Sequence, residues 1–403
     1  MTPSIGGICN GRFEGIREVF EENFSHRGEI GASLAIYYKG ELVVDLWGGS
    51  VPSTGSLWQR DTLVNVFSVT KGMSAVCLHM LADRGLLDIE APVARYWPEF
   101  GCNGKETVTV AMALSHQAGV PFWQSTIPEN GLFDWELATT ALAAASPIWE
   151  PGTTHGYHAI SSGFIWGEIV RRITGQTIGA FFRENVAGPL GADLWIGLPE
   201  SEEARVAPIQ LADAHPNSAM FEKVLSEPDW FGGQMLVNTG GLFDPAVIGS
   251  RAFRKAELPA VGALASAAGV ARLYAPLSLD GAIDGVRIVS SSAFPAMRTT
   301  RAASDCDTLL RIPTNFTCGF SKTWGRRGDG PGNHSILGEN AFGAPGMGGS
   351  VGFADCDAGL AFGYVMSRHG PGVALNDRGQ GLIDAAYRAA GYTSDAPGFW
   401  VRS

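Results

Sequence analysis

Two hydrophobic patterns divide the chain, and their positions constrain its fold more than any other feature. Runs rich in β-forming residues at 32–38 and 41–47 flank Lys39-Gly40, a pattern typical of a β-hairpin. From about 105 to 255 the apolar residues follow helical spacing between Gly- and Pro-rich loops. Strand-like runs return only late, at 316–324, 349–354 and 360–366. If the early hairpin pairs with these late runs, both ends of the chain build one sheet.

This arrangement predicts an α/β fold in which an antiparallel sheet is flanked by helices and carries an inserted all-helical domain. We expect residues 1–80 and 256–403 to form an α/β sandwich domain and residues 81–255 to form the insertion. Helices that flank the sheet are indicated by apolar residues at helical spacing near the start of the chain and over 378–390.

The composition excludes several classes of protein. Of the 403 residues 45% are hydrophobic and only 17% are charged, which is incompatible with a mainly disordered chain. A formal net charge of −11 disfavours nucleic acid and anionic membranes as partners, and no run reaches transmembrane length. The six cysteines include no C-x-x-C pair, and the N-terminus lacks a signal-peptide pattern. We therefore expect free thiols and a cytoplasmic location.

The strongest local motif is Ser68-Val69-Thr70-Lys71, the only S-x-x-K in the chain, at the start of a helical pattern over 68–83. This spacing places the serine and lysine side chains on one helical face, within hydrogen-bonding reach. A helix N-terminus supplies free N–H donors and a positive potential, which stabilise an oxyanion and lower the pKa of a nearby ammonium group. Ser68 is thus a candidate nucleophile activated by a neutral Lys71. The plainer interpretation is a helix cap followed by a solvated lysine.

A second candidate is Tyr157, in Gly156-Tyr157-His158-Ala159, ahead of another helical pattern. A phenol has an ordinary pKa of about 10, and a cationic lysine beside it would lower that value towards proton transfer at neutral pH. The plainer interpretation is a packed tyrosine with a satisfied hydroxyl. His155 and His158 form an H-x-x-H pair, but no third ligand of matching spacing is visible, so we expect no metal there.

A glycine-rich segment, 343–350, leads into a predicted strand. Its small residues allow a backbone edge to approach a ligand, and one of its N–H groups is a candidate second oxyanion donor. Within it, residues 348–352 match the G-x-S-x-G nucleophile elbow, which would make Ser350 the nucleophile. That motif requires a strand, a sharp turn and then a helix. Here a strand is predicted to follow, and His369 is the only later histidine, so Ser350 is the weaker candidate.

The three segments, in this order and at these separations, resemble the serine β-lactamase and penicillin-binding protein superfamily. Within it the chain most resembles the class C β-lactamase-related esterases called family VIII carboxylesterases. The segments that carry the resemblance are FSVTKG at 67–72, LSHQAGVP at 114–121 and GSVGFAD at 349–355, and similar stretches extend over most of the chain. The resemblance implies a β-lactamase/transpeptidase-like fold, with the site in the cleft between the sheet domain and the inserted helical domain.

The resemblance also implies a role for each motif residue. Ser68 would be the acylated nucleophile, Lys71 its proton acceptor, and Tyr157 the partner that relays the proton to the leaving group and later activates water. The backbone N–H groups of Ser68 and Met347 would form the oxyanion hole. No cofactor is implied.

Two departures from the family pattern bear on the substrate. Class C β-lactamases have Tyr-x-Asn at the second motif, where this chain has Ala159 in place of the asparagine. They have Lys-Thr-Gly on the late strand, where this chain has Ala344-Pro345-Gly346. The chain thus lacks a cation for a substrate carboxylate and a partner for a side-chain amide. We expect Ala344 and Gly346 to border a site for neutral substrates, with an altered or slower proton relay.

Aromatic residues of the midsection are candidates for the walls of the substrate pocket, and we expect Trp123, Trp230 and Phe231 to line it. The predicted protein is a serine hydrolase that cleaves neutral, short-chain carboxylic esters, with a small-molecule ester as its partner. Two alternatives stay open: a β-lactamase, D-Ala peptidase or acyltransferase of the same fold, and a non-catalytic binding protein on that fold. The sequence leaves the oligomeric state open.

Overall fold

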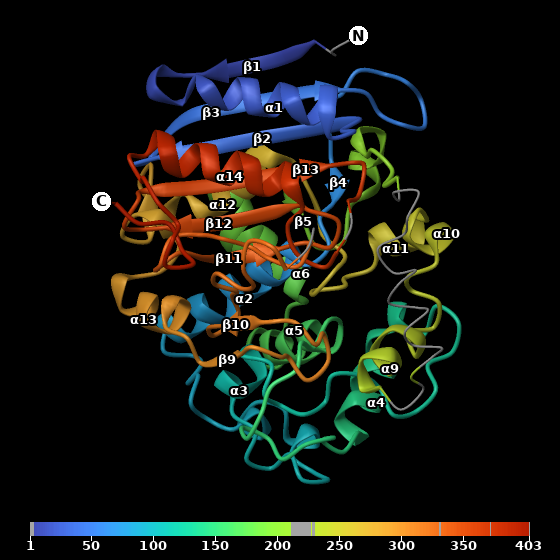
Figure 1. Ribbon diagram of the computed structural model, residues 1–403. Coiled ribbons are helices and arrows are strands. Elements are labelled where there is room, and N and C mark those ends of the chain that lie inside the picture. Colours follow the sequence, from blue (N-terminus) through green and yellow to red (C-terminus); the bar gives the residue numbers. More distant parts are fainter. Residues whose placement is uncertain (1–3, 211–226, 228–229, 330–331, 371, 403) are drawn as a thin grey trace.

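The structure, a computed structural model, describes most of the chain: residues 4–210, 227, 230–329, 332–370 and 372–402. A six-stranded antiparallel sheet lies at its centre, in the strand order β1-β3-β2-β13-β12-β11 (Figure 1). β2 (Gly31–Tyr38) and β3 (Glu41–Gly49) form the predicted hairpin. β13 (Leu360–Met366) pairs with β2, so the prediction that both ends of the chain build one sheet is confirmed.

The two edges of the sheet were less visible in the sequence. β12 (Val351–Asp355) corresponds to the strand predicted at 349–354, and the two edge strands are β11 (Phe342–Pro345) beside it and β1 (Ile5–Cys9) on the other side. β1 falls in a segment whose glycines predict only turns. Its glycines instead permit close approach to β3, since a Cβ on Gly6 would lie 2.7 Å from the Trp47 indole nitrogen.

The predicted strand over 316–324 was wrong in its extent. Only β10 (Thr314–Phe316) forms there, paired with β9 (Ala302–Ser304). Gly319 has a φ of +91°, which turns the chain and ends the extended run.

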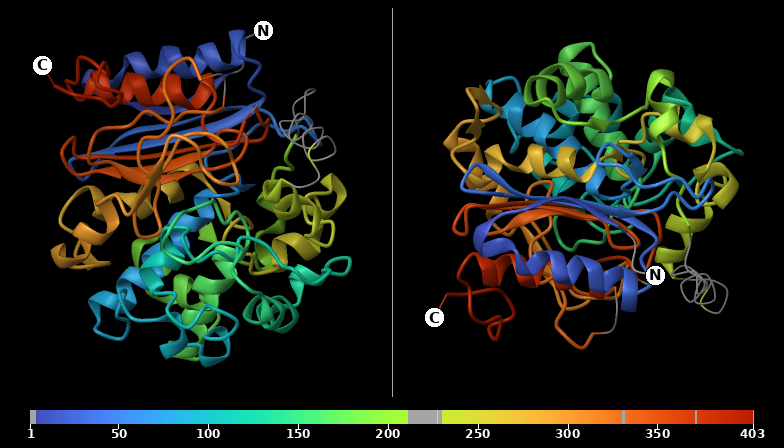
Figure 2. Two further views of the ribbon diagram at one scale, coloured as in Figure 1. Left: turned by 60° about the horizontal axis from the view of Figure 1, so that its bottom comes forward. Right: turned by 90° about the horizontal axis from the view of Figure 1, so that it is seen from above.

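Helices cover both faces of the sheet (Figure 2). α1 (Gly15–His26) and α14 (Asp377–Ala389) pack on one face, where their apolar sides join a core with the sheet residues. α2 (Val69–Asp83) and α12 (Ala267–Tyr274) lie on the other face, within a larger core that continues into the helical region. α2 is buried along nearly its whole length, so its apolar residues are spread around the helix, and polar side chains such as Lys71 and His79 are buried with them.

Between the two halves of the sheet, the regular secondary structure is mainly helical. The described helices of residues 81–255 are α3 (Val110–Leu114), α4 (Trp135–Ala144), α5 (Ser161–Thr174), α6 (Ile178–Phe182), α7 (Gly188–Leu190), α9 (Phe231–Val237), α10 (Pro245–Ile248) and α11 (Arg251–Lys255). The short helix α13 (Phe294–Arg298) follows later in the chain. The domain boundaries at 80/81 and 255/256 stay a prediction, and the first of them falls inside α2.

A second, three-stranded sheet connects distant segments next to the S-x-x-K motif. β6 (Leu264–Ala265) pairs with both β4 (Val64–Asn65) and β5 (Leu194–Trp195). β5 adds a short strand to the region predicted to be helical. This sheet fixes the chain immediately before Ser68 against the segment that follows the helical region.

Two further sequence predictions can be compared with the structure. All six cysteines are free thiols, as expected. Among the described residues, no helix combines the length and the apolar character that crossing a bilayer requires.

Candidate active site

Ser68 occupies the N-cap of α2, at the end of a strained turn. The preceding residue, Phe67, has a φ of +43°, a left-handed conformation that side-chain-bearing residues rarely adopt. Two hydrogen bonds hold this turn: the Phe67 N–H donates to Asn65 Oδ1 (3.3 Å), and Thr70 Oγ1 donates to the Phe67 carbonyl (2.5 Å). The backbone around Ser68 is therefore fixed before any substrate binds.

Lys71 lies one turn along α2 and is buried, with 4% of its surface exposed. Its Nζ is 3.3 Å from Ser68 Oγ and donates to the backbone carbonyls of Ala159 (2.6 Å) and Ala260 (3.1 Å). Burial lowers the pKa of the Lys71 ammonium group well below its ordinary value. The interpretation of a solvated lysine after a helix cap is therefore wrong, and the predicted contact between the two side chains is present.

Tyr157 approaches the same serine from the loop before α5. Its hydroxyl donates to Ser68 Oγ at 2.7 Å, and Lys71 Nζ lies 4.7 Å from the centre of its ring. Burial, together with the carboxylate of Asp307, raises the pKa of Tyr157. From the sequence a lowered pKa of Tyr157 was expected, because a cationic lysine was expected beside it. Burial instead disfavours the charged form of Lys71.

The two predicted oxyanion donors belong to the same cavity. Ser68 and Met347 both line it, and among the described residues neither backbone N–H donates a hydrogen bond to the protein. Gly346 allows the late strand to come this close, since a Cβ there would lie 2.3 Å from the Val66 carbonyl oxygen. Ala344 is buried in β11, and neither Ala344 nor Gly346 lines the cavity.

The cavity beside Ser68 is walled by apolar side chains from several loops and from α9. Its lining consists of Phe67, Ser68, Tyr157, Ala159, Met235, Leu236, Phe243, Val261, Leu310, Met347 and Val373. No side chain in this set is charged. Most of these apolar residues could not be predicted from the sequence, because they come from loops and one short helix without a long periodic pattern.

The three aromatic residues predicted for the pocket lie outside its lining. Trp123 is buried, donates its indole N–H to the Ala138 carbonyl (2.8 Å) and packs edge-on against Phe164. Trp230 is buried, and Phe231 is half exposed to solvent on α9. Trp123 and Trp230 follow the general tendency of large aromatic residues to be buried in the protein, whereas Phe231 lies at the surface.

Ser350 does not have the geometry of a nucleophile elbow. It is fully buried, and the strand β12 follows it directly, where the motif requires a helix. Its hydroxyl has no hydrogen-bond partner among the described residues. This side chain has no access to a substrate, so the elbow interpretation is wrong.

The H-x-x-H histidines make internal hydrogen bonds. His158 Nε2 accepts from the Val120 N–H (3.2 Å), while its Nδ1 lies 2.6 Å from the Gly156 carbonyl oxygen. His155 Nε2 lies 2.9 Å from Thr314 Oγ1. Within the described part of the chain, no group of three or more His, Cys, Asp or Glu side chains is placed to hold a metal ion.

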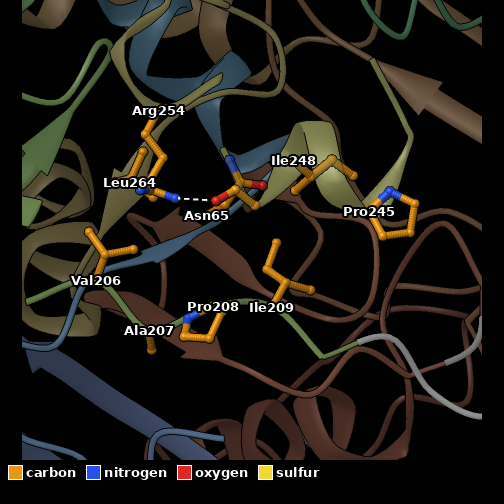
Figure 3. Close-up of a pocket in the computed structure, with 10 residues that line it drawn as sticks. Asn65, Val206, Ala207, Pro208, Ile209, Pro245, Ile248, Arg254 and Leu264 are labelled. Atoms are coloured by element: carbon orange, nitrogen blue, oxygen red, sulfur yellow. Dashed lines mark hydrogen bonds between the residues drawn. The ribbon is translucent and has the colours of Figure 1, made fainter. Parts of the chain in front are cut away.

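A second cavity is lined by Asn65 together with residues of the 206–209, 245–249, 254 and 264 segments. Figure 3 shows Ile209 and Ile248 facing each other across it, with Asn65 and Arg254 on its wall. The Asn65 side chain is turned to other partners, the Val261 carbonyl (2.9 Å) among them. None of Ser68, Lys71 and Tyr157 lines this cavity, so it is not the candidate active site.

Comparisons with known proteins agree over nearly the whole chain. Residues 16–386 match the family model described as Beta-lactamase. The chain is 35% identical over 370 residues to the esterase/beta-lactamase LipL of Mycobacterium tuberculosis (strain ATCC 25618 / H37Rv), which covers 90% of this chain and 83% of that protein.

Three solved structures give the same result for the fold. A family VIII carboxylesterase has a TM-score of 0.84 at 37% identity, covering 96% of this chain and 100% of its own. A penicillin-binding protein homologue from Caulobacter crescentus has a TM-score of 0.81 at 37% identity with the same coverage, 96% and 100%. EstA from Arthrobacter nitroguajacolicus Rue61a has a TM-score of 0.82 at 30% identity, covering 97% and 99%.

Proposed function

Because the chain belongs to the beta-lactamase family and is a serine hydrolase, we propose that it cleaves neutral, short-chain carboxylic esters through an acyl-enzyme on Ser68. Its β-lactamase/transpeptidase-like fold is confirmed by the solved structures, and the esterases among its relatives support ester hydrolysis. One observation carries the proposal: Lys71 Nζ and the Tyr157 hydroxyl meet at Ser68 Oγ, at 3.3 Å and 2.7 Å, beside an apolar cavity.

Acylation in this site begins with Lys71 as a neutral amine. Two of its hydrogen-bonding directions are used by the carbonyls of Ala159 and Ala260, which accept the two N–H groups of the amine. The lone pair then faces Ser68 Oγ at 3.3 Å and takes the hydroxyl proton as the oxygen attacks the ester carbonyl carbon. The negative charge that develops on the carbonyl oxygen is stabilised by the N–H groups of Ser68 and Met347.

The second half of the reaction releases the alcohol. When the tetrahedral intermediate collapses, the C–O bond to the leaving group breaks, and the departing alkoxide takes a proton from the Tyr157 hydroxyl. The phenol regains this proton from Lys71, whose Nζ lies 4.7 Å from its ring centre. Water then attacks the acyl-enzyme with the same groups as proton acceptor and donor, which releases the acid and restores Ser68.

The surroundings of the serine favour a neutral substrate. The cavity is apolar, and position 344, where related β-lactamases carry a cation, is a buried alanine. A carboxylate placed in such a site would be desolvated without a partner, which is costly. A negative charge close to the scissile bond is therefore expected to weaken substrate binding.

The pKa shift of Lys71 predicts the pH dependence of hydrolysis. The folded protein lowers this pKa well below its ordinary value, so the free base that the mechanism requires is present at a lower pH than for a solvated lysine and is lost on acidification. We expect kcat/KM for a p-nitrophenyl ester to reach its plateau well below about pH 10 and to fall towards acid. A lysine with its ordinary pKa of about 10.4 would instead give a rate that rises steeply up to pH 10, and that profile would contradict a neutral Lys71.

A comparison of three chromogenic substrates tests the proposed function. We expect p-nitrophenyl butyrate to be hydrolysed with a kcat/KM at least about tenfold above that of mono-p-nitrophenyl glutarate, whose free carboxylate finds no cation in the cavity. A chromogenic cephalosporin, also anionic, should be slower still. A kcat/KM for the cephalosporin equal to or above that of the butyrate ester would favour the β-lactamase alternative. The absence of turnover for all three would favour a non-catalytic protein.

A further inference from the structure

A buried carboxylate behind Tyr157 has no counterpart among the motif residues. The Asp307 side chain is fully buried, in a loop far along the chain from Tyr157. Its oxygens accept hydrogen bonds from the backbone N–H of Tyr157 (3.2 and 3.1 Å) and from those of Leu309 and Leu310 (2.8 Å each). The Thr314 hydroxyl donates a further bond at 3.3 Å.

Within the described residues, His155 is the basic side chain within ion-pair distance of Asp307, at 3.8 Å, and burial lowers the pKa of this histidine. The hydrogen bonds therefore stabilise a carboxylate whose own pKa is raised by burial. A buried carboxylate is costly unless several donors satisfy it, and charge-assisted N–H bonds are the strong ones. Asp307 therefore holds its donors firmly, because losing any of them would leave a buried charge less compensated.

The donors belong to two parts of the active site that are distant in sequence. Tyr157 carries the phenol that contacts Ser68, while the Leu310 side chain lines the apolar cavity. One carboxylate thus ties the segment that bears the proton donor to the loop that supplies a wall of the pocket. Removing its charge would loosen both at once.

Asp307 also acts on the phenol through its charge. The titratable groups that face Tyr157 are Lys71 from α2, His116 with its ring centre 4.9 Å away, and Asp307. Burial lowers the pKa of both Lys71 and His116, which favours their neutral forms. Burial raises the pKa of Tyr157, and the negative charge of Asp307 adds to this shift.

We propose that Asp307 is a positioning residue that acts through Tyr157 and Leu310, holding the proton donor against Ser68 and setting the wall of the ester pocket. This role rests on the proposed function, because it is defined by the hydrolytic reaction at Ser68. It is distinct from a purely structural role, because it predicts changes in the pH profile and in substrate choice.

The test compares Asp307→Asn with Asp305→Asn, a matched change two residues away on a side chain that is 95% exposed. We expect Asp307→Asn to lower kcat by about 10- to 100-fold, since small displacements of a catalytic group have effects of this size. KM should change less than about threefold. The substitution removes one of the effects that raise the pKa of Tyr157, so the loss of activity at alkaline pH should begin at a lower pH than in the wild type. Asp305→Asn should match the wild type.

Two further variants separate the two effects and protect the test from a folding failure. Leu310→Ala should let longer acyl chains react without moving the pH profile. Thr314→Val removes one donor to Asp307 and should reproduce the Asp307→Asn changes more weakly, even if Asp307→Asn does not fold. A kcat and pH profile like those of Asp305→Asn, in whichever of the two variants folds, would overturn the proposal. The proposed function itself would then still stand on hydrolysis by the wild type.

Discussion

Ser68→Ala is expected to abolish ester hydrolysis, with kcat/KM for p-nitrophenyl butyrate falling by at least about 10⁴-fold. The reason is chemical: alanine has no atom that can form the acyl bond, so only binding and the oxyanion donors remain. The variant should fold normally, because Ser68 makes no side-chain capping bond to α2. Thermal unfolding within a few degrees of the wild type would establish this.

The matched control for that variant is Ser350→Ala. Ser350 lies in the G-x-S-x-G match, is fully buried and has no hydrogen-bond partner for its hydroxyl among the described residues. Removing an unpartnered buried hydroxyl should leave activity unchanged and stability equal or slightly higher. Activity that survives in Ser68→Ala and disappears in Ser350→Ala would reverse the assignment of the nucleophile.

Lys71→Met is expected to lower kcat by roughly 10³-fold, within the range for loss of a general base. Methionine keeps an unbranched apolar stem of similar length but provides no lone pair for the Ser68 proton. It also leaves the carbonyls of Ala159 and Ala260 without their donor, so a loss of about 1 to 3 kcal/mol in the free energy of unfolding should accompany the kinetic effect.

Lys105→Met is a close control, because it separates the loss of the general base from the loss of stability. Lys105 is also buried, and its Nζ also donates to two backbone carbonyls, those of Cys102 (2.9 Å) and Ala145. It belongs to neither the Ser68 cavity nor its hydrogen bonds. Lys105→Met should therefore lower stability while kcat of the folded enzyme stays at the wild-type value. Equal kcat losses in Lys71→Met and Lys105→Met would show that Lys71 matters only for folding.

The outline of the fold could be predicted from the sequence because its signals are local. The hairpin of β2 and β3 and the long helix α2 each have a clear period or turn, and the late strands show the same β-forming residues. The edge strand β1 was missed because its glycines have low strand propensity. They instead allow close contact with Trp47. That contact depends on the assembled sheet.

The active site, like the fold, could be predicted only in part. The spacing of Ser68 and Lys71 on one helix predicted their contact, and the resemblance supplied Tyr157. The partners that tune these groups could not be predicted. The carbonyl of Ala260 carries no side-chain signature, and nothing in the local sequence distinguishes the buried Asp307 from the exposed Asp305 two residues earlier.

The residues that line the pocket could not be predicted from the sequence, for a different reason. Aromatic side chains were the visible candidates, yet Trp123 packs in the core and the wall is built from aliphatic residues such as Met235 and Leu310. Short apolar segments in loops have no period, so their direction in space is fixed only by long-range contacts. The Leu310 N–H donates to the nearby Asp307, and the long-range contact is the bond from the Tyr157 N–H to the same carboxylate.

The most direct measurement for the central claim is the intact mass of the protein after treatment with a fluorophosphonate, which labels activated serines without needing the natural substrate. We predict one adduct on the wild type, mapped by peptide sequencing to Ser68, with the same adduct on Ser350→Ala and none on Ser68→Ala. A wild type whose mass stays unchanged, or an adduct that persists in Ser68→Ala, would contradict an acyl-enzyme on Ser68.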